Sequence, residues 1–164
     1  MKTGTENRMP KIAVVDYGMG NLFSVSQACI KVGLHPVITS ASEDLIQADG
    51  VVLPGVGAFK DAMRALRQLD LVGTLMDVAR SSKPFLGVCL GMQLMMTESS
   101  EFGVSKGLGI IDGVVERLTN GSNCGYIYKV PQVGWNRIYK SNTDNLDNGV
   151  DLDWKSPLLL GIRD

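Results

Sequence analysis

The sequence predicts an α/β protein whose mostly parallel sheet is covered by helices on both faces. Four short apolar runs point to this fold class: residues 11–16, 37–39, 50–53 and 85–88. Turns containing glycine or proline and amphipathic stretches separate these runs, which gives the order β-α-β-α-β-α-β-α. A chain of 164 residues can bury one sizeable core, so we expect a single domain.

The first predicted strand, Lys11 to Asp16, is a β-branched run that ends at the turn Gly18-Met19-Gly20. A helix should follow it, with Asn21 as the N-cap and Gly33 as the stop. The apolar residues of this helix recur along one face: Leu22, Val25, Cys29 and Val32. Cys29 is therefore expected to pack in the core.

The later strands lead into further loops. Val37 to Thr39 follows Pro36, a residue tolerated at the start of a strand. Gly50 to Leu53 ends at Pro54-Gly55-Val56-Gly57, and residues 59–69 and 71–79 then carry apolar residues at helical spacing. Phe85 to Val88 leads into Cys89 and a helix. Because sites in parallel sheets lie at the carboxyl ends of the strands, we expect loops 17–21, 54–57 and 88–93 to form the site.

The second half and the N-terminus have different patterns. Gly107 to Gly113, Val114 to Leu118 and Tyr126 to Tyr139 are predicted to form strands, connected by hairpins and antiparallel. Residues 141–153 have the composition of a solvated loop. Residues 1–10 are predicted to form a flexible tail, because they lack the apolar stretch of a signal peptide or a membrane span.

Charge and cysteine content exclude several classes of function. The chain has 16 Lys and Arg residues and 17 Asp and Glu residues, so neither nucleic acid nor a membrane surface is an expected partner. The three cysteines are Cys29, Cys89 and Cys124, an odd set without a CxxC pair. This pattern predicts neither a disulfide framework nor a metal site, and it favours a cytoplasmic location.

The most informative motif is Gly-Val-Cys-Leu-Gly, which places Cys89 between a predicted strand and a predicted helix. This layout is typical of a nucleophile elbow, which displays a reactive side chain above the sheet. N–H groups at the start of a helix favour a thiolate, and that of Leu90 could hold an oxyanion. Alternatively, Cys89 fills the end of the sheet. The Gly55-Val56-Gly57 loop favours a reactive cysteine, because its backbone can offer a second N–H.

Other candidate motifs carry less weight. Gly18-x-Gly20 has Phe23 where a dinucleotide fingerprint needs a third glycine, and the phosphate-loop pattern does not occur. His35 is the only histidine, and its place before the second strand predicts a solvated or core role. Trp135 fits a core position or an interface anchor about equally.

Four motifs in order resemble a known family: residues 15–21 (VDYGMGN), 53–57 (LPGVG), 87–93 (GVCLGMQ) and 131–136 (PQVGWN). The chain resembles the glutaminase subunit of imidazole glycerol phosphate synthase, a class I, triad-type glutamine amidotransferase. The resemblance covers residues 11–164, and it implies one glutamine amidotransferase domain with that family's flavodoxin-like fold.

The resemblance also implies a reaction and a set of roles. Glutamine would be hydrolysed to glutamate and ammonia through a cysteine thioester, without a cofactor or metal, and the ammonia would be channelled to a (β/α)₈-barrel cyclase subunit. It implies Cys89 as the nucleophile and the N–H groups of Leu90 and Val56 as the oxyanion hole. The implied glutamine-binding residues are Gly55, Gly57 and Gln93. The implied partner-interface residues are Asn21, Trp135 and Asn136.

The sequence departs from the family pattern in two places. The His-x-Glu segment of the family lies beyond position 164, so we expect this chain to be a C-terminally truncated form with little activity of its own. Pro131-Gln132 stands where histidine-pathway subunits have Pro-His. This leaves open a paralogue that supplies ammonia for a surface-polysaccharide sugar amidine. A non-catalytic binding partner and a stand-alone cysteine hydrolase are further alternatives, although the hydrolase would need a suitably placed histidine.

Overall fold

The computed structural model describes residues 8–117 and Gly134. Residues 1–117 form one unit and residues 118–164 another, and the helices and strands described lie in the first. Its main sheet has the order β2-β1-β3-β4, with β1 at Lys11–Val15, β2 at His35–Thr39, β3 at Gly50–Leu53 and β4 at Phe85–Gly87. All three strand pairs are parallel, as predicted. The chain runs outward from β1 to β2 and then through β3 to β4, so the topological switch point lies between β1 and β3.

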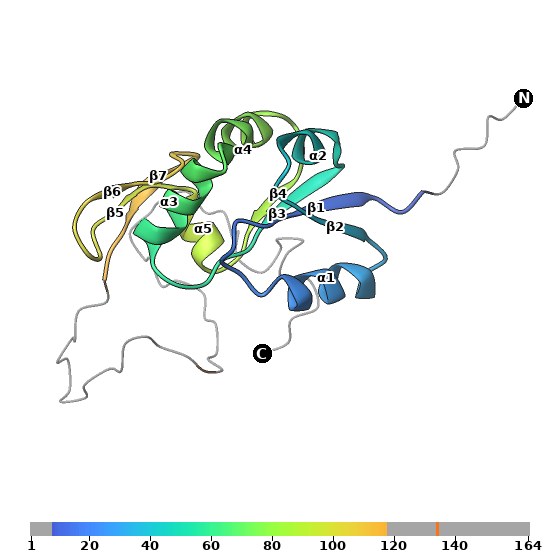
Figure 1. The fold of residues 1–164 in the computed structure, drawn as a ribbon, viewed down its shortest axis with the longest axis horizontal. Coiled ribbons are helices and arrows are strands. Elements are labelled where there is room, and N and C mark those ends of the chain that lie inside the picture. Colours follow the sequence, from blue (N-terminus) through green and yellow to red (C-terminus); the bar gives the residue numbers. More distant parts are fainter. Residues whose placement is uncertain (1–7, 118–133, 135–164) are drawn as a thin grey trace, which may run out of the picture. The chain divides into compact units, whose positions relative to one another are not determined.

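Helices cover both faces of this sheet, as the sequence predicts (Figure 1). α1 (Leu22–Lys31) lies on one face, and α2 (Ser42–Gln47) and α4 (Leu71–Arg80) lie on the other. α3 (Phe59–Gln68) contacts both α4 and α5 (Leu90–Leu94). α2 is the helix between the second and third strands. The sequence pattern predicted a helix there but gave no residue range for it.

The core forms where α3 and α4 pack against the central strand β3. All four residues of β3 are buried. The helices contribute residues at helical spacing, all fully buried or nearly so: Phe59, Ala62, Met63, Leu66, Leu71, Leu75 and Val78. Asp70 separates the two helices, because its φ of 54° lies in the left-handed region. Because β3 is packed on all sides along its length, the first residue of the loop that follows it is held in place.

A second sheet has the order β6-β5-β7, with β5 at Met96–Ser99, β6 at Ser105–Lys106 and β7 at Ile111–Val115. β5 and β6 are antiparallel, as expected for this half of the chain. The expectation of two antiparallel strands at residues 107–113 and 114–118 is wrong, because β7 is one strand that crosses this boundary and pairs with β5 in parallel. The N–H of Leu108 donates to Leu94 (2.8 Å) and that of Ile110 to Met95 (2.9 Å), which returns the chain to the start of β5. Residues 126–133 and 135–153, where further strands and a loop are predicted, lie outside the described residues.

The amino end of β1 is fastened by hydrogen bonds. Asp49 accepts from the backbone N–H of Lys11 (2.6 Å) and from the guanidinium of Arg8 (2.8 Å). The Lys11 N–H, with Arg8 beside it, lowers the pKa of the Asp49 carboxyl. The carbonyl of Pro10 accepts from the N–H of His35 (2.9 Å). Residues 1–7 of the predicted tail lie outside the described part of the chain.

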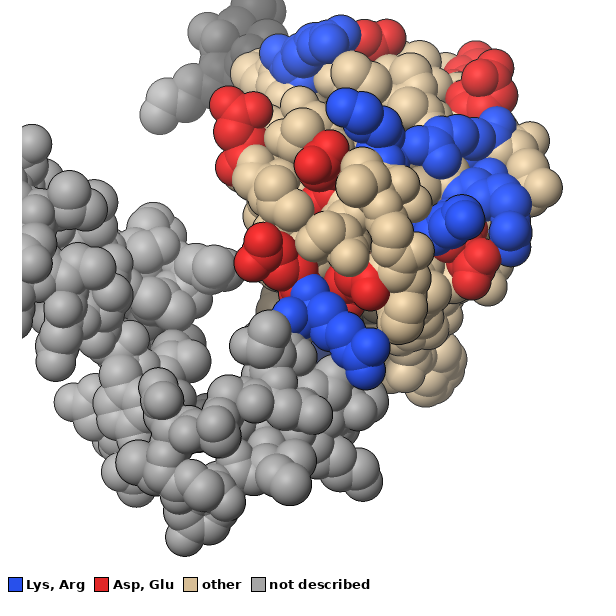
Figure 2. All heavy atoms as spheres, turned by 90° about the vertical axis from the view of Figure 1, so that its left-hand side faces the viewer, with Lys and Arg blue, Asp and Glu red and all other residues tan. Residues whose placement is uncertain are grey.

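Charges of both signs are mixed on the surface of this unit. Exposed ion pairs include Arg64–Asp61 (2.7 Å) and Arg80–Asp77 (3.6 Å). Figure 2 shows basic and acidic side chains next to one another on one face. Because the two signs of charge are mixed, the face shown has no large patch of positive or negative electrostatic potential.

Candidate active site

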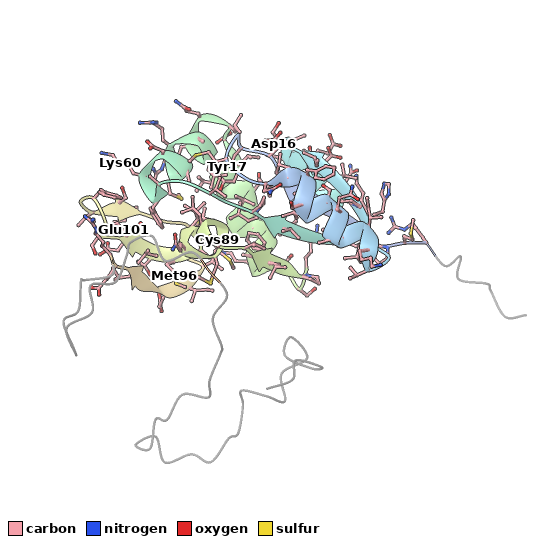
Figure 3. All side chains as sticks on the ribbon, turned by 90° about the horizontal axis from the view of Figure 1, so that it is seen from below. Asp16, Tyr17, Lys60, Cys89, Met96 and Glu101 are labelled. Carbon is pink, nitrogen blue, oxygen red and sulfur yellow. The ribbon has the colours of Figure 1, made fainter. Side chains whose placement is uncertain are left out.

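Three loops meet at the carboxyl edge of the main sheet, as the sequence predicts. They follow β1, β3 and β4, which are neighbours in the sheet. The ring of Pro54 lies 3.3 Å from the position that a Cβ on Gly20 would take, which brings the first loop against the second. Figure 3, which labels Tyr17 and Cys89, shows this edge between α1 and the second sheet.

Cys89 occupies the turn between β4 and α5 and has an unusual backbone. Its φ of 55° and ψ of −118° make it one of two non-glycine residues with positive φ in the part of the chain that the structure describes. The thiol is free and the residue is exposed, in contrast to Cys29, which is buried as expected. The sulfur of Cys89 is therefore accessible, on a strained turn that directly follows a strand.

The glycines around Cys89 permit close backbone packing. A Cβ on Gly91 would overlap the carbonyl oxygen of Leu53. A Cβ on Gly87 would lie 2.7 Å from the Cα of Met92. The N–H of Val88 also donates to Leu53 (3.0 Å), so the turn is held tightly against the end of β3. Only glycine fits at these two positions without displacing the backbone.

The loop after β3 packs directly against the start of α5. A Cβ on Gly55 would lie 2.8 Å from the nitrogen of Gly91 and 2.9 Å from the Cβ of Leu90. Among the described residues, the backbone N–H groups of Leu90 and Val56 have no hydrogen-bond acceptor, as is normal for Leu90 at the first position of a helix. Two N–H groups without an acceptor in residues 8–117 therefore come from the two segments that meet beside Cys89.

The loop after β1 contributes a residue that the sequence analysis did not single out. Tyr17 is only 4% exposed, and its hydroxyl donates to the carbonyl of Pro54 (2.8 Å). Burial, with a smaller contribution from the charge of Cys89, raises the pKa of Tyr17 to about 12. The phenol therefore stays protonated near neutral pH. The sequence signal for Tyr17 is its position two residues after a buried strand. This signal is weak, because the hydrogen-bond acceptor of Tyr17 is distant in the sequence.

The other predicted site residues are placed as follows. Asn21 is the N-cap of α1, as predicted, and its side chain accepts from the N–H of Ser24 (3.1 Å). Gln93 lies on α5, where its N–H donates to the carbonyl of Cys89 (3.2 Å). Trp135 and Asn136 lie outside the described residues. His35 begins β2, at the amino edge of the sheet, opposite the edge that carries Cys89.

Residues 8–117 contain neither a metal-binding cluster nor a membrane-spanning helix. This range holds no group of three or more His, Cys, Asp or Glu side chains that could bind a metal ion. None of its helices has the length and apolar character needed to cross a membrane.

Comparison with known proteins identifies the class. The pattern of the family "Glutamine amidotransferase class-I" matches residues 13–151. The chain therefore belongs to the class I glutamine amidotransferase family. A solved structure described as a glutamine amidotransferase aligns over 68% of this chain and 58% of its own, with a TM-score of 0.56 and 18% identity. That likeness supports the fold alone.

Within the family, the chain is similar to subunits of one enzyme. It is 45% identical over 140 residues to the imidazole glycerol phosphate synthase subunit HisH of Bacillus cereus strain AH187, which covers 85% of this chain and 64% of that protein. It is 43% identical over 143 residues to the subunit of the same name from Geobacillus thermodenitrificans strain NG80-2, covering 87% of this chain and 67% of that protein. The resemblance predicted from the four motifs is confirmed. The chain spans about two thirds of the length of these relatives.

Proposed function

We propose that this chain carries the thiol and oxyanion-hole part of a glutaminase that hydrolyses glutamine to glutamate and ammonia. The observation that supports this best is the exposed thiol of Cys89, which stands on a positive-φ turn against a glycine loop. A strand, a strained cysteine and a helix in this order have the form of a nucleophile elbow. Family membership supports glutamine as the substrate.

The proposed reaction proceeds in two stages. The Cys89 thiolate attacks the γ-carboxamide carbon of glutamine, and the carbonyl oxygen becomes an oxyanion that accepts hydrogen bonds from Leu90 and Val56. The C–N bond then breaks, the nitrogen takes up a proton and leaves as ammonia, and a thioester remains. Water hydrolyses the thioester to glutamate and frees the thiol. Each oxyanion donor contributes roughly 3 kcal/mol of transition-state stabilisation in enzymes of this type.

Substrate binding is assigned to the two glycine-containing loops. Gly55 and Gly57 would let the loop after β3 approach the glutamine closely, and Gln93 would bind it from α5. Gly57 has a φ of 101°, which a residue with a side chain rarely adopts. A methyl group there would also lie 2.8 Å from the Cε of Met19.

Among residues 8–117, no histidine lies near Cys89 to give a proton to the leaving ammonia. The chain has one histidine, His35, which starts β2 at the other edge of the sheet. We propose that the His and Glu of the triad lie outside these 164 residues, as the family resemblance implies. General acid–base catalysis typically contributes about 10²–10⁴-fold to a rate, so the 164-residue chain should turn over slowly.

We further propose that residues 11–164 belong to one domain that delivers ammonia to a cytoplasmic (β/α)₈-barrel cyclase of histidine biosynthesis. Asn21, Trp135 and Asn136 would contact that partner. The relatives from Bacillus cereus and Geobacillus thermodenitrificans are named as subunits of imidazole glycerol phosphate synthase, which favours this branch over the polysaccharide paralogue.

Labelling of the thiol tests the proposed function. A chloroketone analogue of glutamine should modify Cys89 in the 164-residue chain, and excess glutamine should protect it. Peptide mass spectrometry identifies the modified residue. Cys89→Ser should abolish the labelling, whereas Cys29→Ser, which removes the buried free thiol, should leave it unchanged. Labelling without glutamine protection, or at another cysteine, would contradict the proposal.

A further inference from the structure

The outer edge of β4 is open in residues 8–117. β4 is the last strand in the order β2-β1-β3-β4, and within this range it pairs with β3 alone. The carbonyl of Pro84 accepts from Val51 (2.9 Å), and the N–H of Val88 donates to Leu53 (3.0 Å). Successive residues of a strand turn their N–H and C=O groups to opposite sides, so residues 84, 86 and 88 face β3. The backbone groups of residues 85 and 87 therefore face outward.

Apolar side chains accompany this open edge. Leu86 is 50% exposed and Val88 is 39% exposed. A Cβ on Gly87 would lie 2.7 Å from the Cα of Met92, so position 87 faces α5. Because side chains alternate between the two faces of a sheet, Leu86 and Val88 project from the opposite face. Two exposed apolar side chains thus lie beside an edge that can still form hydrogen bonds.

The other edge of the main sheet is protected, whereas the β4 edge is not. At β2, the N–H of His35 donates to the carbonyl of Pro10 (2.9 Å), so His35 faces β1 and the next residue faces outward. That residue is Pro36, which has no N–H to offer to a further strand. Edge strands commonly carry proline or lysine, which oppose pairing with another chain. The residues of β4, Phe-Leu-Gly, include neither.

The outward groups of β4 match those of a second copy turned by 180°. They lie one residue before and one residue after Leu86. If an antiparallel copy places its Leu86 opposite Leu86, Phe85 of each copy lies opposite Gly87 of the other. An antiparallel pair of this type exchanges two N–H···O bonds, and the contact contains two such pairs. Two-fold symmetry of this kind is the commonest in protein oligomers.

We propose that the outer edge of β4 is an interface between two copies of this chain, which pair in antiparallel about a two-fold axis at Leu86. The two main sheets then form one continuous sheet, and Leu86 of each copy is covered by Leu86 of the other. The strand is shorter than the usual length of about five to six residues, so the contact is small and the dimer dissociates readily. This inference is independent of the proposed glutaminase function.

The first test measures association of the 164-residue chain by sedimentation equilibrium. A reducing agent prevents disulfides between the exposed Cys89 thiols. The chain should be mostly monomeric at about 1 µM and mostly dimeric at about 1 mM, the range of a weak complex. Hydrogen exchange at both concentrations locates the contact. The amides of Phe85 and Gly87 should exchange more slowly in the dimer, whereas the Leu86 amide faces β3 and should not change.

Charges at position 86 test the two-fold arrangement. Leu86→Lys and Leu86→Glu should each weaken dimerisation about 10-fold or more, because two like charges would lie directly opposite one another. An equal mixture of the two variants should dimerise again, because a lysine then lies opposite a glutamate. Ile38→Lys is the matched control, since Ile38 is 48% exposed on β2 at the other edge of the sheet. This variant should dimerise like the wild type.

Several outcomes would overturn the inference. A chain that stays monomeric at about 1 mM has no such interface. Slow exchange of the Phe85 and Gly87 amides at both concentrations would show that a segment of the same chain pairs with this edge. Equal dimerisation of the wild type and the Leu86 variants, or a mixture that stays monomeric, would show that the copies do not meet at Leu86. Should the variants not fold, the exchange of the two amides in the wild type decides the question.

Discussion

At the scale of single residues, Cys89 and its neighbours show what an exposed thiol at this position requires. A non-glycine residue held at φ 55° and ψ −118° costs about 1–3 kcal/mol relative to ordinary backbone. The surrounding contacts must offset that cost. Gly91 makes the closest of these contacts, since its Cα lies against the carbonyl of Leu53.

Gly91→Ala should therefore destabilise the protein by about 1–3 kcal/mol or more, the usual range for overpacking a close contact. Gly73→Ala is the matched control, because Gly73 lies in α4 with open space around the position of a Cβ. That change should stabilise the helix by up to about 1 kcal/mol. Urea unfolding would measure both, and similar midpoints for the two variants would contradict the packing described at Gly91.

At the scale of elements, capping fixes the start of α1 and thus the end of the first site loop. The side chain of Asn21 accepts from the N–H of Ser24 (3.1 Å), which satisfies one of the unpaired donors at the helix start. Asn21 is also proposed to contact the cyclase. The two roles predict different consequences for different substitutions.

Asn21→Ala should cost about 1 kcal/mol of stability, whereas Asn21→Ser should cost only a few tenths because serine also caps helices. Thermal melting of the two variants would separate the capping effect from binding. If Asn21→Ser keeps the wild-type melting temperature but weakens binding to a barrel cyclase, the interface role is supported. Equal loss of stability in both variants would contradict the capping role.

Carboxylates at the edges of β1 make the stability of this element depend on pH. The Lys11 N–H and Arg8 lower the pKa of Asp49, and the hydroxyl of Thr39 and the ammonium of Lys11 lower that of Asp44. A lowered folded-state pKa gives stability that is present above the unfolded value, about 3.9 for Asp. That stability is lost as the pH falls through the folded-state value.

Asp49→Asn should consequently lower the melting temperature at about pH 7, and the difference from the wild type should shrink at about pH 3. Asp61→Asn, which removes an exposed ion pair within α3, serves as the control and should have a small effect at either pH. Melting curves recorded at both pH values provide the measurement. A difference for Asp49→Asn that grows on acidification would reverse the sign and disprove the explanation.

At the scale of the whole molecule, the parallel sheet separates the only histidine from the thiol. His35 pairs with Lys11 at the amino edge, whereas Cys89 follows β4 at the carboxyl edge. A strand of five residues spans roughly 15 Å at about 3.3 Å per residue, which is too far for direct proton transfer. The fold thus excludes His35 as the acid or base for Cys89.

His35→Gln should leave the chloroketone labelling of Cys89 unchanged, and ammonia release by the 164-residue chain should be slow with or without this substitution. An assay for ammonia with glutamine as substrate would check both statements. A fall of about 10-fold in either rate on His35→Gln would show that the histidine participates. Fast turnover by the wild-type chain would show that another residue supplies the proton.

The sequence determined the features that depend on local pattern. The four parallel strands, the helices α1, α3 and α4, and the Asn21 cap follow from apolar periodicity and turn residues. The convergence of the three loops also follows, because the carboxyl ends of parallel strands share one edge. Four ordered motifs were sufficient to identify the family.

Only the tertiary structure decided the features that depend on partners far away in the chain. α2 and β5 are too short for periodicity to locate, and β7 runs parallel to β5 because residues 108 and 110 hydrogen-bond to residues 94 and 95. The hydrogen bond of Tyr17 could likewise not be predicted from the sequence, since its acceptor Pro54 lies 37 residues further along the chain. A sequence pattern records what each residue prefers, whereas a hydrogen bond across the fold depends on where two segments meet.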